Sequence, residues 1–172
     1  MNRCNNQWSN RWSCSGSDGT ASTTVALVEP ELRLPLDLRE WITPETLAAW
    51  VQEEIAKLNW THPEVQRRLS EHPDYQPQTM LRLLTLAYAT GAFSSQEIVR
   101  KCHTESLLQS LCQGGPPFAQ ELKCFRHKNR GLLGAVLHRV STRALREKLH
   151  LTPDPLVPEL ERLVADNTME RL

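Results

Sequence analysis

The stretch TMLRLLTLAYATG, residues 79–91, restricts the possible folds more than any other part of the sequence. Its side chains are apolar nearly all the way round a helix, and such a helix must be covered by other elements over most of its surface. Gly91 follows as a residue that tolerates the left-handed backbone of a helix end. We therefore expect residues 79–91 to be the most buried helix, with other helices packed around it.

Apolar residues recur at helical spacing in most of the remaining segments as well. Thr43, Pro44 and Glu45 form a helix-start signal, and that helix should run to about residue 59. Ser94 and Glu97 have the spacing of a capping box. Further helices are expected at 63–71, 94–103, 104–113, 118–130, 129–150 and 159–172. No alternation of β-branched and polar residues is long enough for a strand, so the sequence predicts an all-α bundle of six to eight helices.

The composition changes at both ends of the predicted bundle. Residues 1–30 are rich in Asn, Ser, Thr and Gly without an apolar period, which predicts a disordered tail. The helical domain is expected at 31–150, followed at 151–172 by a linker and a terminal helix with little to pack against. The N-terminus lacks the basic stretch and apolar core of a signal peptide, so we expect none, and no apolar run is long enough to span a membrane. With five irregularly spaced cysteines, these features favour a soluble cytoplasmic protein with reduced thiols.

The formal net charge is zero, but the charges are segregated along the chain. Residues 91–150 hold 10 Lys and Arg against 4 Asp and Glu, whereas 31–75 hold 5 against 9 and 151–172 hold 2 against 5. A basic middle between acidic flanks is typical of a surface that meets a polyanion. A solvated helix face without any partner remains the alternative.

The helix expected at 118–130, FAQELKCFRHKNR, concentrates that positive charge. Phe118, Leu122 and Phe125 recur at helical spacing and should pack inward. The cations on the other side are the predicted DNA-binding residues, which are Lys123, Arg126, His127, Lys128 and Arg130. Together with the helix at 104–113 and the turn GGPP, the segment resembles a helix-turn-helix unit, whose second helix reads DNA while flanking cations neutralise phosphates.

Two chemical alternatives have weaker support. Cys102, His103, Cys112, Cys124 and His127 are ligand types that zinc favours, but structural zinc sites usually include a close cysteine pair, and none is present. No cysteine or serine stands in a motif for nucleophilic catalysis, and no glycine-rich phosphate loop follows a strand. We therefore expect no metal site, no cofactor, no small-molecule substrate and no catalytic residues.

A family resemblance covers residues 75–140. Bacterial insertion-sequence transposases of the DDE class have an N-terminal helical domain with the pattern Y-x-P-x-x-L-L-x-L-x-x-Y-x-x-G, then S-x-x-x-I, L-x-x-L-C-G and R-F-R-x-x-N. The chain resembles this domain through Tyr75 to Gly91, then Ser94 to Ile98, then Leu108 to Gly114, and finally Cys124, Phe125, Arg126 and Asn129. It departs at Phe118 to Glu121, where the family commonly has Asp and Ser or Thr, and at Cys124, where the family has Arg.

The resemblance implies a DNA-binding front end of a transposase, nucleoid-associated, with Arg100 and Lys101 supporting at the DNA backbone. Double-stranded DNA at transposon ends is the implied partner. The linker and the terminal helix together hold about twenty residues, too few for the catalytic domain of a working transposase, so we expect a truncated or separately encoded protein that does not itself transfer strands. One alternative is an interaction module that pairs with itself or with a full-length transposase through the apolar face of 133–144. The other is a remnant without function.

Overall fold

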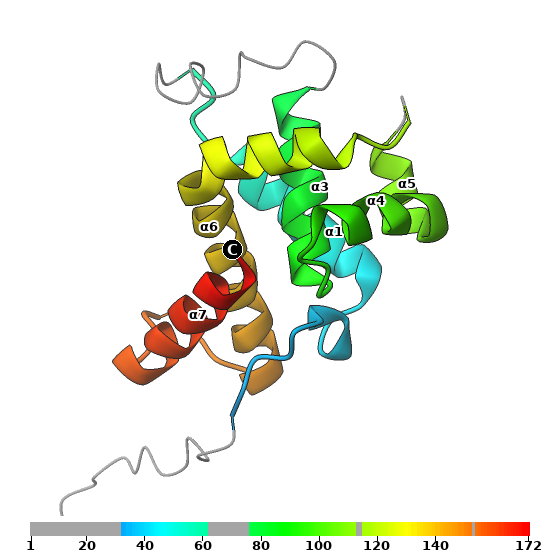
Figure 1. Cartoon of the computed structure of the whole chain (residues 1–172). Coiled ribbons are helices and arrows are strands. Elements are labelled where there is room, and N and C mark those ends of the chain that lie inside the picture. Colours follow the sequence, from blue (N-terminus) through cyan, green and yellow to red (C-terminus); the bar gives the residue numbers. More distant parts are fainter. Residues whose placement is uncertain (1–31, 62–75, 113–114, 153) are drawn as a thin grey trace, which may run out of the picture. The chain divides into compact units, whose positions relative to one another are not determined.

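The computed structural model describes residues 32–61, 76–112, 115–152 and 154–172. These residues form six α-helices and one short 3₁₀ helix and contain no strand, which confirms the all-α prediction (Figure 1). The helix predicted at 63–71 and the predicted tail at 1–30 lie outside the described residues. The elements are η1 (Leu38–Glu40), α1 (Pro44–Ala56), α3 (Pro77–Ala89), α4 (Ser95–Thr104), α5 (Ser106–Leu111), α6 (Ala119–Leu149) and α7 (Pro158–Arg171).

The helix ends follow the predicted capping signals. The Thr46 amide donates to Thr43 Oγ1 at 3.4 Å at the start of α1, and the Glu97 amide donates to Ser94 Oγ at 3.1 Å at the start of α4. Gly91 ends the α3 region with φ +75°, a conformation that costs glycine little because it has no Cβ. These three signals are local, and the structure confirms each of them.

Helix α3 is the centre of the bundle, as its apolar surface predicts. Every residue from Leu83 to Ala89 is buried, and α1, α5 and α6 all pack against this helix. The polar hydroxyl of Thr85 and the ring of Tyr88 are enclosed with the leucines. Burial of this much apolar surface is the main stabilising contribution to such a fold.

Helix α6 contains the two helices predicted at 118–130 and 129–150, which follow one another without a loop and meet at a kink at Asn129, as predicted. It is one element of 31 residues that bends at Asn129, whose φ of −114° and ψ of 18° are not helical. Asn129 is fully buried, and its Nδ2 donates to the Phe125 carbonyl at 3.0 Å, so it bonds back to the first half of α6. Figure 1 shows the yellow first half and the olive second half of α6 running in different directions.

The apolar face at 133–144 is not an association surface. Its members are completely buried within the bundle: Leu133, Val136, Leu137, Val140 and Ala144. Helix α6 packs against α1, α3 and α7 within the bundle. The predicted surface for pairing with another protein is therefore wrong, because intramolecular packing already covers it.

Helix α7 is better anchored than the sequence suggested. It packs against α6, and its Leu160 and Val164 are buried. Leu172 approaches α6 so closely that a Cβ on Gly134 would lie 2.9 Å from its Cδ1. The expectation of little to pack against is wrong, because α7 packs on α6, where Gly134 leaves room for Leu172.

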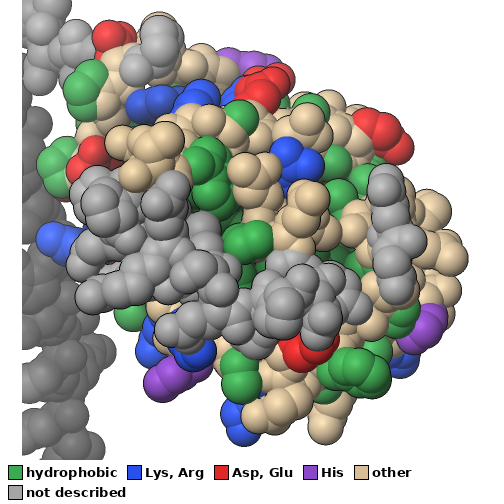
Figure 2. All heavy atoms as spheres, turned by 90° about the horizontal axis from the view of Figure 1, so that it is seen from above, with side chains coloured by type: hydrophobic (Ala, Val, Ile, Leu, Met, Phe, Trp, Pro, Cys, Tyr) green, Lys and Arg blue, Asp and Glu red, His purple; other side chains and the backbone are tan. Residues whose placement is uncertain are grey.

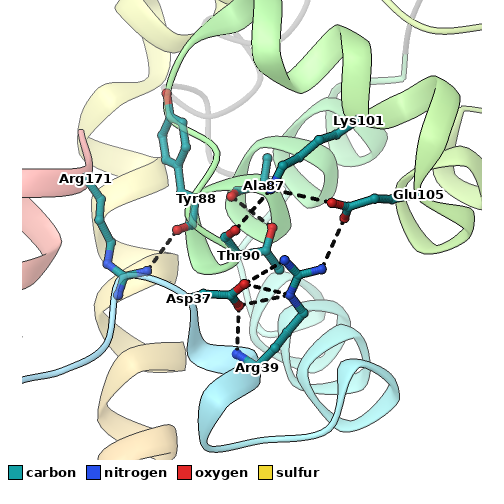
Figure 3. A network of polar contacts seen from close by, with 8 residues as sticks. All are labelled: Asp37, Arg39, Ala87, Tyr88, Thr90, Lys101, Glu105 and Arg171. Atoms are coloured by element: carbon teal, nitrogen blue, oxygen red, sulfur yellow. Dashed lines mark hydrogen bonds and ion pairs between the residues drawn. The ribbon is translucent and has the colours of Figure 1, made fainter.

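Two polar clusters join elements that are far apart in sequence (Figure 3). Arg171 donates to the Tyr88 carbonyl at 2.8 Å, as Figure 3 shows. It also donates to Asn167 Oδ1 at 2.7 Å and to the Pro35 carbonyl. Beside it, the Asp37 carboxylate accepts from Arg39, which also reaches Glu105 of the α4–α5 junction at 3.3 Å. These contacts fix the segment before α1 between α7, the end of α3 and the end of α4.

Candidate nucleic-acid interface

The first half of α6 separates an apolar side from a charged side, as its spacing predicted. Leu122 and Phe125 are buried, while Lys123, His127 and Arg130 are exposed. Residues at i, i+4 and i+7 lie on one side of a helix, so these three side chains form a stripe along the outside of the bundle. We call Lys123, His127 and Arg130 the α6 stripe.

The cations of the α6 stripe have no competing partner in the part of the chain that the structure describes. No hydrogen bond or ion pair joins their side chains to other described residues, so no carboxylate neutralises them there. Lys128 is also exposed, although it does take part in an interaction. Figure 2 shows Lys and Arg side chains of this side of the molecule in several separate groups, with acidic side chains beside some of them.

Arg126 is placed differently from its neighbours on α6. It is half-buried, and its Nη1 donates to the Tyr88 hydroxyl at 3.3 Å and to the Phe93 carbonyl at 3.0 Å. Both acceptors belong to α3 or the turn after it, so Arg126 ties α6 to the centre of the bundle. The sequence alone did not distinguish this arginine from the exposed cations around it.

Arg100 and Lys101 of α4, which were predicted to support DNA binding, differ in their exposure. Arg100 is exposed and its side chain makes no hydrogen bond or ion pair with other described residues, whereas the Lys101 side chain is only 14% exposed. Lys101 Nζ donates to the Thr90 carbonyl at 3.3 Å and lies 3.5 Å from Glu105 Oε1 (Figure 3). Arg100 can therefore meet an external anion, and Lys101 is occupied within the protein.

Phe118 corrects the prediction that it packs inward with Leu122 and Phe125. Its side chain is 75% exposed. Phe118 is the N-cap of α6 with extended backbone angles, so the helical spacing that orients Leu122 does not apply to it. Its amide donates to Glu121 Oε2 at 2.8 Å, which satisfies one of the open donors at the start of the helix.

The segment before α6 supports the predicted helix-turn-helix unit only loosely. Helix α5 is shorter than the expected 104–113, because α4 continues to Thr104 and α5 covers only Ser106–Leu111. It packs mainly against α3 and α4. The first half of α6 also contacts α3, so the two helices share a common support, and their use as a DNA-reading pair stays a prediction.

Sequence reasoning missed a second group of cations on the last turns of α6. Arg143 lies 4.7 Å above the Trp50 ring and bonds Glu53 Oε2 at 2.7 Å, which lowers the pKa of Glu53. Arg146 donates to the Asp154 carbonyl at 2.9 Å, and Arg143, Arg146 and His150 line a hollow of about 390 Å³. Arg143 and Arg146 are three residues apart in the sequence, and this helical spacing could have indicated the group. Arg143 is neutralised by α1, so the group is a weaker candidate for DNA than the α6 stripe.

The cysteines show no metal centre in the described residues. No group of three or more His, Cys, Asp or Glu side chains is close enough there to hold an ion. Cys102 and Cys112 contact each other instead, and a hydrogen bond from this contact, together with burial, raises the pKa of the Cys102 thiol.

No helix in the described part is long and apolar enough to cross a membrane.

A family model described as a transposase domain (DUF772) matches residues 36–128, which is more than half of the chain. The chain belongs to this transposase family. The family match begins just before η1 and ends at Lys128, one residue before the bend of α6. It therefore includes α1, α3, α4, α5 and the front half of α6. No curated protein and no solved structure matches the chain.

The family match confirms the resemblance that the motifs between residues 75 and 140 indicated. The transposase domain contains most of the predicted DNA-binding residues, from Arg100 to Lys128, whereas Arg130 lies just beyond the matched range. Membership of this family suggests a role in transposition.

Proposed function

We propose that this transposase-family chain binds double-stranded DNA during transposition, with transposon ends as its targets, and that the α6 stripe contacts the phosphate backbone. The observation that carries the proposal is the exposure of Lys123 and Arg130 without a neutralising carboxylate among the described residues. Lysine and arginine in this state release counterions from DNA when they bind phosphates, which is a favourable contribution to affinity.

The arrangement around the α6 stripe supports a backbone contact. The bundle holds the helix rigidly, because Leu122 and Phe125 are buried on its inner side and Arg126 bonds to α3 and to the Phe93 carbonyl. Arg100 adds an exposed cation from α4, which packs against α6. Rigid elements with cations on one side fix the register of a protein on DNA, and base contacts then add sequence preference.

The salt dependence of DNA binding tests this proposal. Lys123, Lys128, Arg130 and Arg100 offer about four phosphate contacts, so log affinity for a duplex should fall with log salt at a slope of about −3 to −4. The double variant Lys123→Ala/Arg130→Ala should bring the slope closer to zero by about 2. Fluorescence anisotropy with a labelled duplex at several salt concentrations measures both values.

A matched control uses Arg162→Ala, because Arg162 is an exposed arginine on α7 outside the transposase-domain match. This variant should keep the wild-type slope. DNA binding that is absent, or a slope that the Lys123→Ala/Arg130→Ala variant leaves unchanged, would show that the α6 stripe does not contact phosphates.

A further inference from the structure

A hollow lined largely by apolar residues lies between α1, α3 and α5, and the function above does not use it. Its volume is about 330 Å³. Ala48, Ala49 and Gln52 of α1 form one wall, and Leu107 and Leu111 of α5, both half-exposed, form the other. Small side chains on one wall and leucines on the other leave room for a helix to approach the backbone of α1 closely. We call this hollow the α1–α5 groove.

The α1–α5 groove contains an arginine whose Nε has no hydrogen-bond acceptor among the described residues. This residue is Arg82 of α3, and its Nε is buried. A buried donor of a charged group that stays unpaired is costly, because it has lost water and gained nothing in exchange. Arg82 as a whole is half-buried, so a carboxylate that entered the groove could pair with its guanidinium and offset this cost.

The face of α1 beside the α1–α5 groove offers such a carboxylate. Glu45 precedes Ala48 and Ala49 by three and four residues, so all three lie on the same side of α1. Glu45 is exposed, and no ion pair connects it to another described residue. The same surface of one molecule thus carries an unpaired acid, small side chains and an arginine with an unpaired Nε.

We propose that a second copy of this chain docks on the α1–α5 groove through its own α1. A surface that carries both members of a charge pair can meet itself across a two-fold axis, with each pair formed twice. If two α1 helices cross antiparallel at Ala48 and Ala49, Glu45 of one copy comes opposite the turn that holds Gln52. Gln52 lines the same groove as Arg82, so each Glu45 carboxylate lies within reach of the arginine of the other copy.

Charge reversal tests the docking without DNA, so its outcome does not depend on the proposed DNA binding. Wild-type protein should associate to a dimer in sedimentation velocity as its concentration is raised. Glu45→Arg and Arg82→Glu should each weaken the dimer by about tenfold or more, because like charges then meet twice. The double variant Glu45→Arg/Arg82→Glu should recover the wild-type dissociation constant to within about threefold, because the pair is restored with its signs exchanged.

Glu170→Arg is the matched control, because Glu170 is an exposed acid on α7 away from the α1–α5 groove, and it should leave the dimer unchanged. Circular dichroism melting shows whether each variant is folded, and a rescue by the double variant cannot come from misfolding. A monomer at every concentration would overturn the proposal, and so would a dimer that either single reversal leaves intact. A double variant that stays as weak as the single ones would show that Glu45 and Arg82 do not meet.

Discussion

At the scale of single residues, similar side chains on α6 have different roles. Arg126 lies only three positions after Lys123 and four before Arg130, yet it bonds to Tyr88 and to the Phe93 carbonyl, whereas its neighbours face solvent. On α4, Lys101 is held by Thr90 and Glu105 while Arg100 is exposed. The charge of a residue type is visible in the sequence, but its partner is not.

Substitution of Arg126 should therefore reduce the stability of the fold, whereas substitution of Lys123 should reduce DNA binding and leave the stability nearly unchanged. Arg126→Ala removes two hydrogen bonds from a charged donor, so the free energy of unfolding should fall by about 1–3 kcal/mol. Lys123→Ala, on an exposed face, should change it by less than about 0.5 kcal/mol. In DNA titrations, Lys123→Ala should bring the salt slope about 1 closer to zero. Urea unfolding and anisotropy measure the two effects, and equal stability losses would contradict the assignment.

At the scale of elements, the ion pairs of Arg39 with Asp37 and Glu105 attach the segment before α1 to the junction of α4 and α5. Asp37 caps η1 by accepting from the Arg39 amide at 2.9 Å, and its carboxylate also accepts from Arg39 Nε and Nη2. Burial alone would raise the pKa of Asp37, but the hydrogen bonds and charge of Arg39 outweigh it and lower that pKa below the ordinary value of 3.8. We call Asp37, Arg39 and Glu105 the η1 clasp.

The η1 clasp predicts a loss of stability in acid. Because the pKa of Asp37 is lower in the folded state than in the unfolded chain, its contribution is present above the ordinary pKa of 3.8 and disappears as the pH falls through the lowered folded value. Asp37→Asn should remove this part of the pH dependence and lower the stability at neutral pH. Urea unfolding of the wild type and of Asp37→Asn between pH 7 and pH 3 measures this difference. If the free energies of unfolding of the two proteins change in parallel with pH, the η1 clasp does not stabilise the fold in this way.

At the scale of the whole molecule, Arg171 joins the two ends of the described bundle. It is only 2% exposed, and all three of its donor groups have acceptors, on Asn167, Tyr88 and Pro35. Burial lowers the pKa of this arginine to about 10, which still leaves it charged at neutral pH. Helix α7 is thereby fixed to the end of α3 and to the segment before η1.

Loss of Arg171 should be the most damaging of the substitutions considered. Arg171→Ala leaves two buried carbonyls and the Asn167 amide oxygen without a donor, so the free energy of unfolding should fall by about 3 kcal/mol or more. Arg162→Ala, on the exposed side of the same helix, should change it by less than about 0.5 kcal/mol. Urea unfolding compares them, and a small effect of Arg171→Ala would mean that α7 is held mainly by Leu160 and Val164.

Much of this protein follows from short-range information. The Thr43 and Ser94 caps, the Gly91 stop and the apolar period of α3 depend on residues within a few positions of one another, and each was predicted correctly. The separation of Leu122 and Phe125 from Lys123, His127 and Arg130 is equally local. These patterns are sufficient for an all-α fold and for a candidate DNA-binding helix.

Contacts across the bundle decided the rest. The bonds of Arg126 and the burial of Arg171 depend on residues that lie next to one another only after the helices pack. The burial of the 133–144 face has the same origin, since helical period shows that a face is apolar but not which molecule covers it. Helix formation is encoded locally in the chain, whereas the partner of each side chain is chosen by three-dimensional packing.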